Sequence, residues 1–380
     1  MTRREWIALI SAAPLLKAAP GPEGTPEGNA PAAPVAIGKC ASYDEDVTAH
    51  LATMFDQLGG LDRMVRGKTV TIKLNMTGSP GLRVDGRPPG VTHYVHPKLV
   101  GATAHLMGRA GARRIRFVES AWATSGPLED YLLDSGWNVR QLLAAAPGVE
   151  FENTNALGKS KKYARFKVPG GGYLFPAYDL NQAYEDTDVF VSMGKLKSHA
   201  TCGVTLSMKN CFGMLPASIY ADDAGVDQPN ENPTAGRAKT MHAGRRQPSK
   251  SAPPELDPSS SREPGYRVPH IVADLVKSRP IDVQIIDGIE SIAGGEGPWI
   301  GGVRRVQPGV LLAGLNPVST DAVAAAVMGY DPSAARGTAP FRNCENTLLL
   351  AERHGVGSAD LRRIDVRGVP IAGAMYRYDA

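Results

Sequence analysis

The sequence predicts an α/β protein with a mostly parallel sheet, helices on both faces and one long irregular insertion. Strand-like and helix-like segments alternate from residue 35 onward, and this alternation favours parallel strands because each crossover helix packs back onto the sheet. The 380 residues are 42% hydrophobic and 21% charged, which is typical of a chain that buries a full core. The 42 glycines and 30 prolines predict long loops that carry much of the site chemistry.

The first half of the chain shows the alternation most clearly. Residues 69–75 predict a strand because apolar and polar side chains alternate there. Pro97 suits the first position of the following helix, and Gly111 suits its C-terminal cap. The other elements expected here are strands at 35–40, 114–119 and 188–193 and helices at 46–58, 127–135 and 179–185.

Residues 221–267 interrupt this pattern with proline, serine, glycine and mixed charge. They have almost no apolar periodicity, so we expect an irregular insertion within an α/β domain of residues 35–380. A lid over a substrate and an insertion without function are both compatible with this composition. After it the expected elements are a helix at 269–277, strands at 282–287 and 309–315, and a helix at 317–328.

Residues 1–20 resemble a twin-arginine signal. Arg3 and Arg4 stand just before the apolar stretch 6–16, and residues 21–34 have the composition of a linker. We therefore expect export by the Tat machinery to the periplasm or another extracytoplasmic location; the alternative is an ordinary flexible start. The apolar stretch is too short to span a bilayer, so no integral membrane span is expected.

Composition and motifs exclude several classes of protein. The net charge of +4, from 42 basic and 38 acidic residues, is too balanced for a nucleic-acid partner to be expected. The four cysteines form no CxxC, so no iron–sulfur motif or zinc ribbon is present. They are expected as small buried side chains, with a disulfide as the alternative. GxSxG, HExxH and Walker A motifs are absent, as is a GxGxxG after a strand.

The most informative segment is the run VFVSMGKLKSHATCGVTLSMKNCFG at residues 189–213. If its start is extended, Lys195, Lys197 and His199 lie on one face at the C-terminal end of the strand, where open α/β sheets bind ligands. The following segment reads as a helix that adds Lys209. Together these groups favour a small anionic ligand, a carboxylate or phosphate. The alternative is a solvated strand end with no ligand.

Other polar residues are expected at the same edge of the sheet. Lys73 and Asn75 end the strand at 69–75, and Glu119 and Asp287 end two further strands. The two carboxylates are suited to proton transfer or to a divalent metal. His96 directly precedes the helix that starts at Pro97, so its imidazole either caps that helix or faces the site.

These segments resemble the DUF362 family of uncharacterised prokaryotic proteins. The resemblance covers most of residues 35–332, and its most specific block is DVFVSMGKLKSHATCGVTLSMKNCFGMLP. Some members carry ferredoxin-type cysteine motifs, which this chain lacks, so a redox role is not implied here. The resemblance implies no catalytic roles, but it marks as characteristic polar positions Lys73, His96, Lys195, Lys197, His199, Lys209, Asn210 and Asp287.

The leading hypothesis is an exported enzyme that acts on a small anionic substrate by Lys/His acid–base chemistry. The expected catalytic residues are His199, His96, Lys209 and Asp287, and the expected substrate-binding residues are Lys73, Asn75, Lys195, Lys197 and Asn210. A divalent metal would be held by Glu119 and Asp287. The alternatives are an exported anion- or metal-binding protein without turnover and a redox or iron–sulfur-associated protein.

Overall fold

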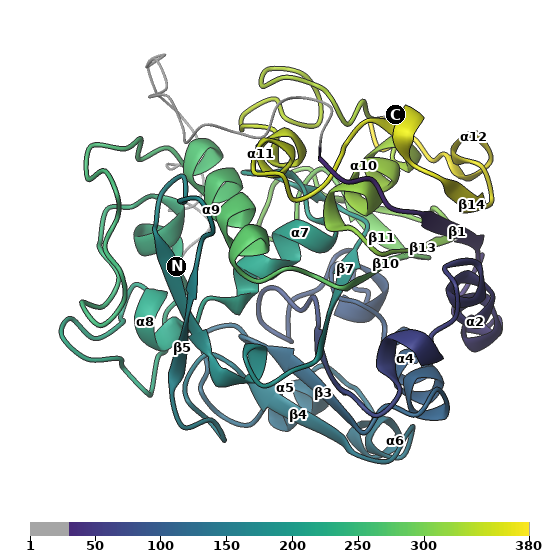
Figure 1. Ribbon diagram of the computed structural model, residues 1–380, viewed down its shortest axis with the longest axis horizontal. Helices are drawn as coiled ribbons and strands as arrows, with labels where there is room; N and C mark the ends of the chain where they lie inside the picture. Colours follow the sequence, from purple (N-terminus) through teal and green to yellow (C-terminus); the bar gives the residue numbers. More distant parts are fainter. Residues whose placement is uncertain (1–29, 380) are drawn as a thin grey trace.

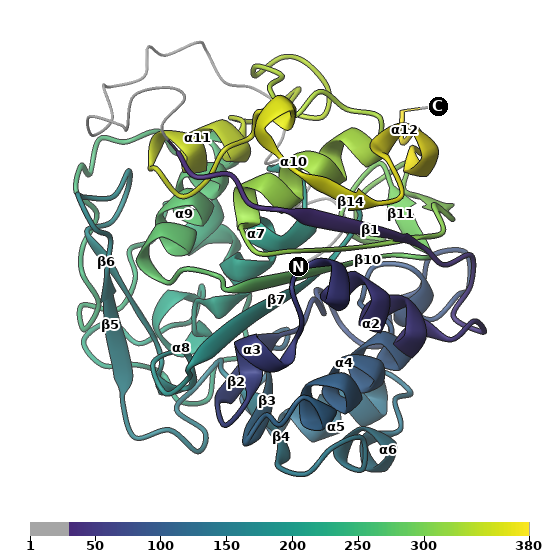
Figure 2. The same cartoon turned by 45° about the vertical axis from the view of Figure 1, so that its right-hand side comes forward.

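A sheet of eight strands forms the centre of the computed structural model, which describes residues 30–379. From one edge to the other it consists of β14 (Val366–Gly368), β1 (Val35–Lys39), β13 (Val310–Gly314), β10 (Val283–Gly288), β7 (Val189–Lys195), β2 (Thr69–Lys73), β3 (Arg114–Glu119) and β4 (Val149–Asn153). Only β13 runs against its neighbours in this sheet. The predicted mostly parallel sheet is therefore confirmed (Figures 1 and 2).

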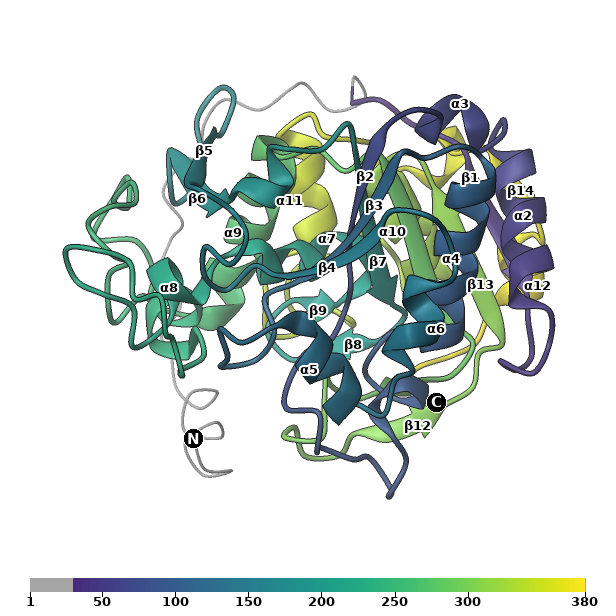
Figure 3. The ribbon, with the colours of Figure 1, turned by 90° about the horizontal axis from the view of Figure 1, so that it is seen from below.

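Helices cover both faces of the sheet, which divides the core into two apolar clusters. One face carries α2 (Val47–Gln57), α4 (Pro97–Arg109), α5 (Leu128–Asp134) and α6 (Val139–Leu143). The other carries α7 (Leu206–Asn210), α9 (Pro264–Ser278), α10 (Pro317–Val327) and α11 (Thr347–Arg353). Figure 3 shows the first group of helices and the second on opposite sides of the strands.

Short elements connect these layers. The small helices are α3 (Asp62–Val65), α8 (Ala217–Tyr220), α12 (Ile371–Ala374), η1 (Pro89–Val91), η2 (Gln182–Tyr184), η3 (Cys211–Met214) and η5 (Leu361–Arg363). Three antiparallel pairs join β5 (Tyr163–Lys167) to β6 (Ala177–Asn181), β8 (Ser198–His199) to β9 (Gly203–Val204), and β11 (Ser291–Ala293) to β12 (Arg304–Val306).

The helix predicted at 179–185 is wrong. Residues up to Asn181 belong to strand β6, and only the single turn η2 follows. Arg165 on β5 makes two hydrogen bonds to Asp179 on β6, both 2.8 Å long. The Asn181 side chain accepts the Ala183 amide at 2.8 Å, which ends the strand. Pairing with β5 thus makes residues 177–181 a strand, although the local sequence favours a helix.

Residues 221–263 contain one regular element, the π-helix η4 (Ala238–His242). The next helix, α9, begins at Pro264, before the start predicted at residue 269. Pro264 occupies the first turn, where a proline removes no helical hydrogen bond, and Pro269 lies inside the helix. No helix among residues 30–379 is long and apolar enough to cross a membrane. The predicted signal at 1–20 and linker residues 21–29 lie outside the described residues, so export stays a prediction.

Candidate functional site

The carboxyl ends of β2, β3 and β7 face a cavity of about 530 Å³. This is the edge of the sheet at which α/β folds bind ligands. Seven of the residues expected from the sequence line it: Lys73, Asn75, Glu119, Lys197, His199, Lys209 and Asn210. The other three, His96, Lys195 and Asp287, belong to a separate buried cluster described below.

An ion pair between Lys73 and Glu119 forms the floor of the cavity. The Lys73 ammonium lies 2.6 Å from Glu119 Oε1 and also donates to the Asn210 side-chain oxygen at 3.1 Å. The second Glu119 oxygen accepts the Met76 amide at 2.8 Å. Burial raises the pKa of Glu119, although Lys73 opposes that shift. Gly213 passes so close that a Cβ atom there would lie 2.7 Å from the Lys73 nitrogen. A side chain at residue 213 would therefore displace the Lys73–Glu119 ion pair.

Two amides and a hydroxyl extend this floor. The Asn75 side chain donates to Asn210 Oδ1 at 3.1 Å, and Asn210 donates to three further acceptors on β2 and β7. Asn75 Oδ1 and Thr205 Oγ1 are both buried and have no hydrogen-bond partner within the described structure. Because buried polar atoms are nearly always paired in native proteins, these two atoms are suited to bind a ligand that enters the cavity.

Lys197 and Glu296 meet at the opposite wall. The Lys197 ammonium donates to the backbone oxygens of His93, at 2.6 Å, and of Glu296, at 3.1 Å. The Glu296 carboxylate instead accepts from the Ala200 amide at 2.9 Å and from the Trp299 indole at 3.1 Å. Burial lowers the pKa of Lys197 well below its usual value. This cation is fixed by neutral carbonyls, without a carboxylate in direct contact.

His199 has one ring nitrogen, Nε2, without a hydrogen bond to any residue from 30 to 379. Its Nδ1 accepts the Thr201 amide at 3.2 Å, so the neutral ring carries its proton on Nε2. Burial lowers the pKa of His199 well below its usual value, and the positive charge of Lys209 adds to this effect. The neutral imidazole can therefore donate the Nε2 proton to a ligand in the cavity.

Lys209 differs from the other lysines of the cavity. Within residues 30–379 its ammonium makes no ion pair or hydrogen bond, and its closest described partner is the Phe212 ring, whose centroid is 4.6 Å away. Burial lowers the pKa of this amine, and the positive charges of Lys73 and Arg237 add to the shift. A partly buried cation without an anionic partner is unfavourable, so an anion in the cavity would be stabilised here.

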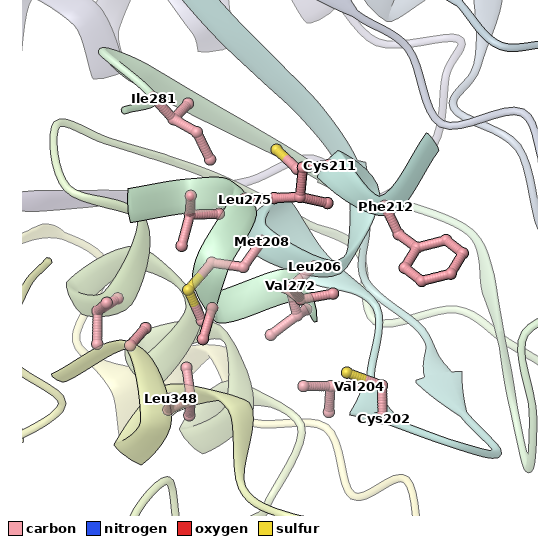
Figure 4. Close-up of a cluster of buried hydrophobic side chains, with 14 of the residues drawn as sticks. Cys202, Val204, Leu206, Met208, Cys211, Phe212, Val272, Leu275, Ile281 and Leu348 are labelled. Atoms are coloured by element: carbon pink, nitrogen blue, oxygen red, sulfur yellow. The ribbon is translucent and has the colours of Figure 1, made fainter. Parts of the chain in front are cut away.

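The short helix α7 holds Lys209 and Asn210 in place. Asp321 from α10 accepts the Ser207 amide at 2.9 Å and the Met208 amide at 2.8 Å, which caps the start of α7. Leu206 begins the helix with a φ of 48°, a conformation that is strained for a residue with a side chain. Figure 4 shows the apolar side of this segment, including Leu206 and Met208, packed toward α9 and α11. The packing supplies the energy that maintains the strained turn.

Several other residues of the cavity lining were not expected from the sequence, among them one charged and one titratable side chain and two tryptophans. Arg237 and His242 come from the irregular segment before α9, and Trp122 and Trp299 come from loops after β3 and β11. Arg237 donates to Leu215 O at 2.8 Å and to Asn155 Oδ1 at 2.7 Å, and burial lowers its pKa to about 10. Burial lowers the pKa of His242 to about 3. No local periodicity marks these residues in the sequence.

Lys195, Asp287 and His96 lie together away from the cavity. The Lys195 ammonium is 3.0 Å from Asp287 Oδ2 and also donates to the Tyr43 hydroxyl at 3.0 Å and Gly90 O at 3.2 Å. Tyr43 donates to the other Asp287 oxygen at 2.7 Å. His96 stacks on Tyr43 at 3.7 Å, and its Nδ1 accepts the Lys98 amide at the start of α4. The imidazole is thus a helix cap, one of the two roles left open by the sequence.

The two carboxylates expected to bind a metal are held in separate ion pairs, Glu119 with Lys73 and Asp287 with Lys195. The structure does not bring them together as a metal site. All four cysteines are free thiols and are buried. In the described part of the chain, one group of three potential metal-ligating side chains is found, Cys40, Glu45 and His50, at the end of β1.

The sequence model of a family described as "Domain of unknown function (DUF362)" matches residues 70–326, more than half of the chain. The chain belongs to the DUF362 family. The resemblance noted in the sequence is therefore confirmed, and the match includes most of the cavity-lining residues of this DUF362 protein.

This DUF362 chain is also similar to a thylakoid-associated protein of Synechocystis sp. The two are 24% identical over 304 residues, which is 79% of this chain and 75% of the relative. Among solved structures, the lactate racemase apoprotein from Thermoanaerobacterium thermosaccharolyticum aligns with 76% of this chain and 58% of its own, at 10% identity and a TM-score of 0.34. Family membership is thus established, and any activity has to be inferred from the cavity.

Proposed function

We propose that this DUF362 protein is an enzyme that binds a small carboxylate or phosphate compound in the cavity and transfers a proton to or from it. The observation that carries the proposal is the charge of the lining. Among the described residues, four cationic side chains line the cavity, Lys73, Lys197, Lys209 and Arg237, against two carboxylates, Glu119 and Glu296. An anionic ligand would compensate this excess of positive charge.

The unpaired groups supply a binding geometry. Among residues 30–379, the Lys209 ammonium has no ion pair or hydrogen bond, and the hydroxyl of Thr205, one helical turn earlier, has no hydrogen bond. His199 offers its Nε2 proton. A carboxylate or phosphate has enough acceptor oxygens to bind all three groups at once. Lys73 and Asn210 are already bonded to each other, so they position the floor and need not contact the ligand.

Proton transfer is the chemistry that these groups favour. Because burial lowers the pKa of Lys209, its ammonium loses and regains a proton more readily than that of an exposed lysine, so the group that pairs with the anion can also exchange a proton with it. His199, neutral with its proton on Nε2, can donate to a developing negative charge on the ligand. A bound carboxylate would place its adjacent carbon near both groups, so proton abstraction or isomerisation is the favoured reaction class.

Calorimetric titration with acetate and with inorganic phosphate tests the binding step. Lys209→Met should weaken anion binding by about 100-fold, equivalent to about 2.8 kcal/mol, because it removes a charge-assisted contact. Lys162→Met is the matched control, because Lys162 is 55% exposed and pairs with Glu185. It should bind anions like the unchanged protein. Equal binding by both variants, or no binding by the unchanged protein, would contradict the proposal.

The catalytic step needs its own measurement. Small carboxylates that bind are incubated with the protein in deuterated water, and NMR follows exchange of the hydrogen on the carbon next to the carboxylate. Exchange that is lost in Lys209→Met and reduced in His199→Gln supports the enzyme. Binding without exchange for every bound carboxylate would instead favour an anion-binding protein without turnover.

A further inference from the structure

We infer that Cys40, Glu45 and His50 form a binding site for a divalent transition metal of the zinc type, separate from the cavity. Cys40 directly follows β1, Glu45 lies in the loop between β1 and α2, and His50 lies in the first turn of α2. Their sulfur, oxygen and nitrogen donor atoms all lie within 4.8 Å of one another. No part of the proposed function uses these residues.

The donor set determines which ions fit. A thiolate, an imidazole and a carboxylate together suit Zn²⁺ and its neighbours such as Co²⁺, whereas Mg²⁺ and Ca²⁺ prefer oxygen ligands alone. Three protein ligands leave the fourth position of a tetrahedral ion for water. The site is therefore expected to hold a zinc-type ion with one exchangeable position and to discriminate against the hard cations.

The separations are close to those that the ion requires. With metal–ligand bonds of about 2.0–2.3 Å, the donor atoms of a tetrahedral site lie roughly 3.3–3.8 Å apart. Here Glu45 Oε2 and His50 Nε2 are 2.9 Å apart, and every other pair in the group is within 4.8 Å. Movements of about 1 Å, within the reach of side-chain rotation, would bring all three donors onto one ion.

The loop already fixes two of the three ligands. Glu45 Oε1 accepts the Ala41 amide at 2.7 Å, which holds the carboxylate toward Cys40 and His50. The Asp46 side chain caps α2 by accepting the Ala49 amide at 3.0 Å, which sets the first turn that carries His50. Binding therefore needs little reordering of the backbone, and preorganisation of this kind favours affinity.

The Cys40 sulfur lies within 4.8 Å of the Glu45 and His50 donor atoms. Cys40 is buried and donates to Ser42 O at 3.3 Å. A divalent ion between Cys40 and Glu45 would stabilise the thiolate and the carboxylate together. One proton is released when the metal binds.

The site also has a structural consequence. Tyr43 lies between the ligands in the sequence, and its side chain contacts Asp287 and stacks on His96. A metal that fixes residues 40–50 would hold Tyr43 against that buried cluster. Ligand binding to the folded state alone raises its stability. Bound Zn²⁺ should therefore raise the midpoint of thermal unfolding.

Titration of the full chain, without an affinity tag, with Co²⁺ and Zn²⁺ tests the inference. The unchanged protein should bind one Co²⁺ per chain with a thiolate-to-metal absorption band, and Zn²⁺ but not excess Mg²⁺ should displace it. Cys40→Ser should lose the band. Glu45→Gln and His50→Asn should weaken Zn²⁺ binding at least ~10-fold, the loss caused by removing even an outer-sphere partner.

Asp44→Asn is the matched control, because Asp44 is a neighbouring carboxylate that pairs with Lys98 at 3.1 Å and is absent from the ligand set. It should keep the absorption band and the affinity of the unchanged protein. Glu45 and His50 are more exposed than Cys40, so their variants keep the test valid if Cys40→Ser fails to fold. Metal binding without a thiolate band, or affinity that none of the three substitutions lowers, would overturn the inference.

Discussion

Lys195 and Lys209 come from the same basic segment, yet the structure gives them opposite surroundings. The Lys195 ammonium is fully buried and has Asp287, Tyr43 and Gly90 as partners. The Lys209 ammonium faces a cavity and has no ion pair or hydrogen bond to residues 30–379. A lysine near the end of a strand is therefore not by itself a sign of ligand binding. Lys195 has a carboxylate of the protein as its counter-charge, whereas Lys209 has none among residues 30–379.

Register explains the difference. In the parallel pairing of β7 with β10, Lys195 lies directly opposite Asp287, so the charges meet within the sheet. Lys209 lies beyond the sheet on α7, whose first residue, Leu206, has a positive φ. The turn at Leu206 directs the helix toward the cavity, where Glu119 and Glu296 already have other partners.

Of the substitutions considered, Lys195→Met should lower the unfolding free energy most, because it removes the cation of the Lys195–Asp287 ion pair. It leaves Asp287 buried without its cation, which typically costs about 3–5 kcal/mol of unfolding free energy. Urea unfolding measures this loss. Lys209→Met should change the same free energy by less than ~1 kcal/mol, since it removes no ion pair. Similar losses for both variants would show that the two lysines do not differ as described.

Gly213→Ala should lower the unfolding free energy by a smaller amount, because it disturbs the Lys73–Glu119 ion pair at the floor of the cavity. A Cβ atom there would lie 2.7 Å from Lys73 Nζ and 3.1 Å from Glu119 Oε1, so the ion pair must shift. Overpacking of this kind costs about 1–3 kcal/mol. Gly301→Ala is the control, since its Cβ would meet nothing within 4 Å. A loss in urea unfolding for Gly213→Ala that equals the loss for Gly301→Ala would mean that the floor is not rigid.

The smallest expected effect is the change in carboxylate affinity with pH. A bound anion raises the pKa of Lys209 back from its lowered value, so binding takes up a proton. Affinity should be full below the pKa of the free protein and fall as the pH rises toward the pKa in the complex. The slope should reach at most about tenfold per pH unit. Calorimetry at several pH values measures it, and a slope retained in Lys209→Met would assign the proton to another group.

Local signals in the sequence predicted most of the fold. Pro97 and Asn316 mark helix starts because capping and first-turn preferences act within a few residues. The strand ends at Lys73 and Glu119 followed from alternation and strand length. The helix predicted at 179–185 failed because a partner strand, invisible to local pattern, determines that segment.

The candidate site was predicted less completely. The seven cavity residues from strand ends and α7 follow from the position of parallel strands. The pairing of Lys195 with Asp287 depends on strand register between segments 92 residues apart, which sequence patterns do not give. Arg237 and His242 lie in a segment without periodicity, and only tertiary contacts bring them to the cavity.

The two walls of the cavity come from different kinds of segment, and Arg237 and His242 belong to the wall that an irregular segment forms. Lys73 comes from β2, Lys197 from the loop after β7 and Lys209 from α7. The segment before α9 provides the facing wall, through contacts such as that of Arg237 with Asn155. Loop segments tolerate insertion and substitution far better than buried strands. Substitutions in this wall can therefore change the size and shape of the cavity without altering the lysines that line its other side.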